Sequence, residues 1–365
     1  MFIDLVQLAK LRKAWVDAEL YNEKFLEQNM YLKESVDLGC TFIPEGLAYE
    51  GASDSEILSS LKFIVEFLGV RHIRLGLRLT SVDLVGQKLG IYEKILDYCF
   101  VNTVKVTLNV GPIKCCGWPE YHIPDSIKES SGELPVNKTI IHDHKVAMEC
   151  VDALEKVLGF LKIRFTEAEL SNIKVIQPEN EGFNPFGQYQ WTFAGQHLDS
   201  VISICDYYLP GRNILLNSAG FFDVDKIVNY ISTRKDADRF IIGLDYYYEA
   251  EQLQGPIVKV LDLFILSWKK GNFGLQKLKI NQAQYQFATE VTEAQMESWG
   301  KSTEQGNSVK SLKYVLLRSA QFLYHNKGVI SLWGLDKFAL KAIRQNLSRE
   351  QKLMAILIQK IQTKI

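Results

Sequence analysis

The chain has 365 residues, a formal net charge of −1, 47% hydrophobic residues and 23% charged residues. This length supports a large buried core, and α/β barrels form single domains of this size. A net charge so close to zero provides no global field that would attract nucleic acid or an anionic membrane. No apolar run approaches the ~18 residues of a membrane span, so we expect a globular protein with neither of these partners.

The N-terminal segment, residues 2–33, has a helical pattern and precedes the first predicted strand. We expect residues 1–33 to form a helical extension outside the main fold. Polar and charged side chains interrupt its start, which therefore lacks the continuous apolar region of a secretory signal. On this basis we expect a cytoplasmic protein.

After this extension, short β-branched runs alternate with amphipathic stretches, a pattern typical of βα units around a parallel sheet. The runs predict strands at residues 36–43, 70–78, 104–111, 173–180, 213–220, 240–248, 284–291 and 329–335. Helical patterns cover residues 88–100, 143–163, 191–208, 223–233, 256–270 and 307–325. Eight such units predict a (β/α)8 TIM barrel over residues 34–365, which together with the N-terminal extension makes a single domain over residues 1–365. A doubly wound sheet is disfavoured because no strand-to-helix turn carries a Gly-x-Gly-x-x-Gly fingerprint.

Two helix starts carry a recognisable capping signal. Ser53 and Glu56 have the spacing of a capping box, and so do Ser348 and Gln351. We expect one helix to begin after Ser53 and the last helix to begin near Arg349.

The six cysteines provide no sign of a metal site. None stands in a Cys-x-x-Cys pair or at metal-ligand spacing with histidine. The neighbours Cys115 and Cys116 are expected to be reduced thiols, because adjacent cysteines rarely bridge well. No glycine-rich phosphate loop follows the last two predicted strands. We expect neither a metal nor a cofactor.

Polar residues stand at the C-terminal ends of several predicted strands, which is where barrel active sites form. These ends carry Arg74 and Arg78, Asn180-Glu181, Asp245-Tyr246-Tyr247, Thr289-Glu290 and Trp333, and the long connection 111–141 carries Trp118. Glu181 and Glu290 come from strands that face each other across the barrel. Glycoside hydrolysis needs such a carboxyl pair, one group to protonate the departing oxygen and one to attack or to activate water.

Several motifs together resemble the clan A retaining β-glycoside hydrolases. "QPENEGFNPFG" is similar to the strand-four motif with the acid/base glutamate, and "QFATEVTEAQMESWG" to the strand-seven motif with the nucleophile. "RFIIGLDYYYE", "RHIRLGLR" and "ISLWGL" look like the segments that supply an active-site tyrosine, arginine and tryptophan. The resemblance implies a TIM barrel that cleaves β-glycosides.

The resemblance assigns expected roles to individual residues. Glu181 would be the acid/base and Glu290 the nucleophile, held ionised by Arg74 and Tyr247. Asn180 would donate to the sugar 2-hydroxyl. Trp333 and Trp118 would stack on sugar faces.

Three alternatives remain open at individual positions. Glu179 lies on the same strand face as Glu181, and only the preceding Asn180 favours Glu181. Glu293 competes with Glu290 but lies beyond the predicted strand end. Arg78 could replace Arg74.

The sequence therefore predicts a retaining β-glycosidase acting on an oligosaccharide, a polysaccharide or another glycoside. The alternative is a catalytically inactive, carbohydrate-binding TIM barrel. A barrel enzyme with a metal or phosphate ligand is disfavoured, because no cluster of histidine and aspartate is visible.

Overall fold

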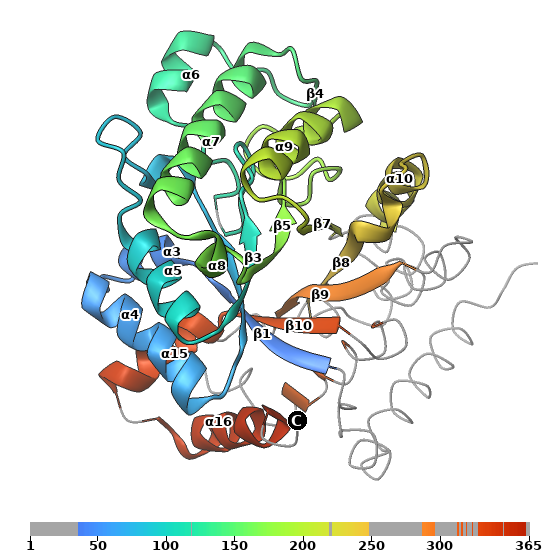
Figure 1. The fold of residues 1–365 in the computed structure, drawn as a ribbon. Coiled ribbons are helices and arrows are strands. Elements are labelled where there is room, and N and C mark those ends of the chain that lie inside the picture. The colour runs from blue at the N-terminus through green and yellow to red at the C-terminus, as the bar shows by residue number, and fades with distance from the viewer. Residues whose placement is uncertain are drawn as a thin grey trace, which may run out of the picture.

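A computed structural model describes residues 36–117, 119–218, 221–247, 287–295, 328–345 and 347–362, with isolated residues between 312 and 323. Parallel strands close a barrel in the order β1-β10-β9-β8-β7-β5-β3-β2 (Figure 1). The strands are β1 Val36–Phe42, β2 His72–Gly76, β3 Lys105–Asn109, β5 Ile173–Gln177, β7 Asn213–Ser218, β8 Phe240–Tyr247, β9 Ala288–Gln295 and β10 Gly328–Trp333. The predicted TIM barrel is confirmed.

Helices follow the strands along the chain and lie outside the barrel (Figure 1). They are α3 Pro44–Tyr49, α4 Asp54–Lys62, α5 Ile91–Val101, α6 Asp125–Ser131, α7 Lys145–Arg164, α8 Glu167–Leu170, α9 Gly195–Tyr208, α10 Phe221–Ser232, α15 Leu335–Arg344 and α16 Arg349–Gln362. None of the helices described is long and apolar enough to cross a membrane. The predicted extension over residues 1–33 and the predicted helix at 256–270 lie outside the described residues.

Both capping signals are confirmed. The Glu56 amide donates to the Ser53 hydroxyl and the Ser53 amide to the Glu56 carboxylate, just before α4. Ser348 and Gln351 make the same reciprocal pair, and α16 begins at Arg349. These bonds satisfy amides that the first turn of a helix leaves unpaired.

The barrel interior is layered, and the layering determines where polar groups can collect. Val175, Leu215 and Ile241, from the adjacent strands β5, β7 and β8, form a small apolar cluster. Two residues further along each strand, on the same inward face, stand Gln177, Asn217 and Gly243. On these three strands an apolar layer therefore lies below, and the polar side chains of Gln177 and Asn217 lie nearer the C-terminal mouth.

The connections after β3 and β5 pack against each other above this mouth. Their short strands β4 Thr139–Ile140 and β6 Thr192–Phe193 pair in parallel. The Tyr121 hydroxyl, from the first connection, donates to the Phe186 carbonyl and accepts from the Trp191 amide, both on the second. The two connections thus form one wall of the mouth.

Candidate active site

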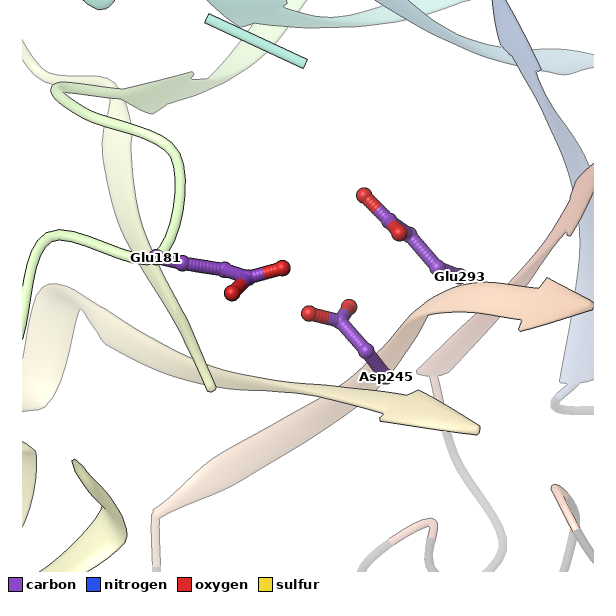
Figure 2. Close-up of side chains that lie close together, drawn as sticks. All are labelled: Glu181, Asp245 and Glu293. Atoms are coloured by element: carbon purple, nitrogen blue, oxygen red, sulfur yellow. The ribbon is translucent and has the colours of Figure 1, made fainter. Parts of the chain in front are cut away.

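Three carboxylates meet at the C-terminal mouth of the barrel. Glu181 follows β5, Asp245 stands in β8 and Glu293 in β9, and the three side chains point toward one another (Figure 2). One oxygen atom of each lies within 4.8 Å of the others, and all three residues are buried. Buried carboxylates so close together favour the protonated form of at least one member of the cluster.

A β-bulge in β9 explains why Glu293 reaches this cluster. Leu244 pairs with Val291, whereas the next residue, Asp245, pairs with Glu293, so β9 contains one extra residue. The pairing of β9 with β10 shifts at the same point. An extra residue lets two successive side chains point to one face of a sheet. The Thr292 hydroxyl accordingly donates to Asp245 at 2.5 Å, and Glu293 accepts from Arg74 at 2.9 Å.

The predicted end of the seventh barrel strand, at residue 291, was wrong because β9 continues to Gln295. Glu290 lies further from the mouth, where it pairs with Gly243. Burial raises the pKa of Glu290 to about 7, with the charge of Asp37 adding to the effect and that of Arg74 opposing it. The structure therefore places Glu293, rather than Glu290, beside Glu181.

Arg74 is the cation at the centre of the site. Its guanidinium, 1% exposed, donates to Gln177 at 2.9 Å, Glu293 at 2.9 Å and Asn180 at 2.7 Å. Although burial lowers the pKa of Arg74, neighbouring negative groups, among them Glu293 and Asp245, raise it above its usual value. Arg74 therefore stays charged and holds Glu293 in place. Arg78 instead faces Glu45 at 3.7 Å and the Cys116 carbonyl at 3.0 Å.

Asn180 is fixed in one orientation. Its Oδ1 accepts from Arg74, from Gln177 at 3.2 Å and from Asn217 at 3.1 Å. Because these donors surround the oxygen, the amide nitrogen must point the other way, and it donates to Glu120 at 2.8 Å. The Asn180 side chain is thus a positioned donor at the mouth.

Asn217 links Glu181 to Asp245. Its Oδ1 accepts from the Glu181 amide at 2.8 Å, and its Nδ2 donates to Asp245 at 3.0 Å. Burial raises the pKa of Asp245 well above its usual value, and the charges of Glu293 and Glu181 raise it further. The sequence placed Asp245 at the end of the predicted sixth strand but gave it no role in the site.

Glu120 is a further carboxyl that the sequence did not reveal. It comes from the connection after β3, where Lys114 and Tyr121 form an isolated bridge that folds the loop back. Glu120 is 8% exposed, and burial raises its pKa to about 8, with the charge of Glu181 adding to the effect. No periodic pattern marks a residue in an irregular loop, so only its bond with Asn180 identifies it.

Glu179 has a different environment from Glu181. Its carboxylate accepts from the Lys114 amide at 2.6 Å and lies 2.8 Å from His197 Nε2. Both side chains of this pair are fully buried. Glu179 therefore ties the loop after β3 to α9, which makes it a structural group and favours Glu181 for the chemistry.

The aromatic site residues are placed less fully. Trp118 lies outside the described residues, and only the backbone of Tyr247, at the end of β8, is described. Trp333 ends β10 and is partly exposed. It shares the strand face of Ser331 and Val329, whose side chains approach Gly39 of β1 inside the barrel. This position is compatible with the role expected of Trp333.

The cysteines agree with the sequence analysis, since all six are free and buried. The three carboxylates of the mouth are oxygen ligands of the kind that hard cations such as Ca²⁺ prefer. Their spacing also suits the two-carboxylate chemistry of glycoside hydrolysis, because an acid and a nucleophile must flank one bond.

Comparison with known proteins supports the fold. No protein-family model matches the chain, and no curated protein matches its sequence. Among solved structures, the N-terminal endo-1,4-beta-D-xylanase 10B of Clostridium thermocellum, complexed with xylohexaose, is 12% identical with a TM-score of 0.53. That match covers 84% of this chain but only 59% of the xylanase chain.

A beta-glucanase from Saccharophagus degradans, in complex with cellotetraose, is also 12% identical, with a TM-score of 0.51. The match covers 90% of this chain and 88% of the glucanase chain. At this identity the likeness is one of fold. The chain thus shares its barrel with glycoside hydrolases, as the resemblance in its sequence motifs implied.

Proposed function

We propose that this protein is a retaining β-glycosidase in which Glu181 is the acid/base and Glu293 the nucleophile. The observation that carries the proposal is the meeting of these two carboxylates at the ends of β5 and β9, with oxygen atoms within 4.8 Å. Retaining enzymes hold their carboxyls roughly 5–5.5 Å apart, whereas inverting enzymes need about 6.5–9.5 Å to admit a water. The short spacing supports the retaining mechanism.

The first step forms a covalent intermediate. The Glu293 carboxylate, oriented by Arg74, attacks the anomeric carbon while the bond to the leaving oxygen breaks. Glu181 gives its proton to that oxygen. In the second step Glu181 takes a proton from water, whose oxygen attacks the anomeric carbon and releases Glu293 as a carboxylate. Asn180, held by the donors around its Oδ1, would donate to the sugar 2-hydroxyl.

The fold comparison supports a proposal for the substrate class. The similar xylanase and beta-glucanase structures hold xylohexaose and cellotetraose. We propose that this chain also accepts a β-linked oligosaccharide or polysaccharide.

A 2-deoxy-2-fluoro glycoside with a good leaving group tests the nucleophile. Fluorine slows both the formation and the hydrolysis of the glycosyl-enzyme ester, whereas the good leaving group speeds its formation. The ester should therefore accumulate on the attacking carboxylate. We expect the added mass on Glu293 by peptide mapping. A label on Glu290 would reject the assignment, and an inverted first-formed product by NMR would reject the retaining mechanism.

Two variants separate the roles of the carboxyls. Glu293→Ala should abolish turnover of every substrate, because nothing replaces the nucleophile. Glu181→Gln should lower kcat/KM about 10²–10⁴-fold for natural glycosides. The loss should be much smaller for dinitrophenyl glycosides, because their leaving group departs without a proton. Azide should partly restore the turnover of Glu181→Gln, because it attacks the covalent intermediate in place of activated water. If no β-glycoside is cleaved by the wild type, the carbohydrate-binding alternative becomes the better explanation.

A further inference from the structure

The carboxyl group of Glu181 is held by a residue three positions further along the chain. The Asn184 side-chain amide donates to Glu181 Oε2 at 2.6 Å. The Asn184 backbone amide donates to the Glu181 carbonyl at 2.9 Å, which closes a turn between them. Asn184 therefore contacts both the backbone and the carboxyl of the proposed acid/base.

A buried lysine fixes the ends of this turn. Lys114, fully buried, donates its ammonium hydrogens to the Glu181 carbonyl and to the Asn184 carbonyl, each at 3.1 Å. The Lys114 carbonyl accepts from the Asn180 amide at 2.8 Å. Because Lys114 bonds to the carbonyls at both ends of the turn, it holds the backbone from which the Asn184 side chain reaches Glu181.

We propose that Asn184 is the positioning residue of the acid/base, an inference that rests on the proposed function. With Oε2 occupied by the amide N–H, the transferable proton resides on Oε1. The hydrogen bond also restricts rotation of the Glu181 carboxyl group about its terminal torsion, which otherwise has a broad distribution of angles. Asn184 thus determines which oxygen of Glu181 faces the leaving group, without touching substrate itself.

The variant Asn184→Leu tests this role, because leucine has a similar size and no donor. We expect kcat/KM for glycosides with poor leaving groups, such as alkyl β-glycosides, to fall about 10- to 100-fold, since misplacing a catalytic group by ~1 Å costs about 10²-fold. For dinitrophenyl glycosides the loss should stay within about threefold, because departure of that group needs no proton. A purely structural role would lower both activities alike.

Asn172→Leu is the matched control. Asn172 also donates its amide to a residue three positions away, the Glu169 carbonyl at 3.0 Å, and is partly buried like Asn184. The control should leave both activities unchanged. Asn184→Ala provides a second variant if leucine disturbs folding, as judged by thermal melting.

The outcomes separate the inference from the function. An active wild type whose Asn184 variants lose nothing, or lose equally on all leaving groups, would overturn the inference alone. A wild type that cleaves no β-glycoside would overturn the proposed function, and the inference with it.

Discussion

At the scale of single residues, Glu181 has the most unusual backbone in the site. Its φ is +45°, in the left-handed region that costs a residue with a side chain roughly 1–2 kcal/mol. Its amide donates to Asn217, and its carbonyl accepts from Lys114 and Asn184. Strained residues persist only where the surroundings determine them, and they cluster at active sites. The strain therefore supports the role proposed for Glu181.

Glu181→Gly should be more stable than Glu181→Ala by about 1 kcal/mol, because glycine adopts a positive φ without a steric cost. Both variants lack the carboxylate, so their difference in the free energy of unfolding reports the backbone strain, less the larger conformational entropy that glycine loses on folding. Denaturant melts of the two proteins measure it. As a control, Ala342→Gly in α15 should cost about 1 kcal/mol, since glycine destabilises a helix. Equal stability of the two Glu181 variants would contradict the interpretation.

Two of the residues expected from the sequence motifs, Asn180 after β5 and Arg74 within β2, lie together at the mouth, where they share a hydrogen bond. Their regular strands made this position predictable, while their roles remain proposals. Glu120 could not be predicted, because its position depends on a loop that folds back on itself. Tertiary contacts of irregular segments leave no periodic trace in a sequence.

At the scale of elements, β9 shows where periodicity fails. Regular alternation would put Thr292 and Glu293 on opposite faces of the strand. The bulge puts both inside the barrel, where Thr292 contacts Asp245 and Glu293 contacts Arg74. A bulge depends on the pairing with neighbouring strands, here β8 and β10, and a single sequence does not show that pairing. The strand could be predicted, but its inward-facing residues could not.

Gly243 of β8 leaves room for the Thr292 side chain that the bulge turns into the barrel. A Cβ on Gly243 would lie 2.8 Å from the Thr292 methyl and 2.9 Å from the Asn217 Cβ. Gly243→Ala should therefore destabilise the fold by about 1–3 kcal/mol. It should also lower activity, because Asn217 and Thr292 hold Glu181 and Asp245.

Gly159→Ala is the control for this substitution. Gly159 lies within α7, and a Cβ there would meet only the Tyr208 ring, at 3.9 Å. We expect a gain of about 0.5–1 kcal/mol in the free energy of unfolding, with activity unchanged. If Gly243→Ala proved as harmless as Gly159→Ala, the close packing against the bulge would be refuted.

At the scale of the whole molecule, the barrel could be predicted because each βα unit repeats the same pattern, a short β-branched run followed by an amphipathic stretch. Because the barrel is closed and its strands are parallel, the C-terminal ends of β2, β5, β8 and β9 meet at one mouth. Residues far apart in the sequence, such as Arg74 and Glu293, therefore come into contact. That convergence concentrates acidic groups in a buried space. Burial of carboxyls without enough cations makes stability depend on pH.

Above neutral pH, carboxyls of the mouth should make stability fall as the pH rises. Burial raises the pKa of Glu120 to about 8, from 4.5 in the unfolded chain. Between these values the folded state binds more protons than the unfolded state, so stability falls as pH rises. Burial lowers the pKa of His72 to about 4 and of His122 to about 3, which has the opposite effect. That effect ends once histidine is neutral in both states, near pH 7.

The wild type should therefore lose stability from pH 7 to pH 8, by on the order of 1 kcal/mol for one carboxyl with a pKa of about 8. Glu120→Gln keeps an acceptor for Asn180 but cannot ionise, so its loss over this range should be smaller. Glu290→Gln, which removes a carboxyl whose pKa is about 7, should reduce the loss mainly below pH 7. Denaturant melts at half-unit steps of pH measure all three. A wild type whose stability changes from pH 7 to pH 8 in the same way as that of Glu120→Gln would contradict the raised pKa of Glu120.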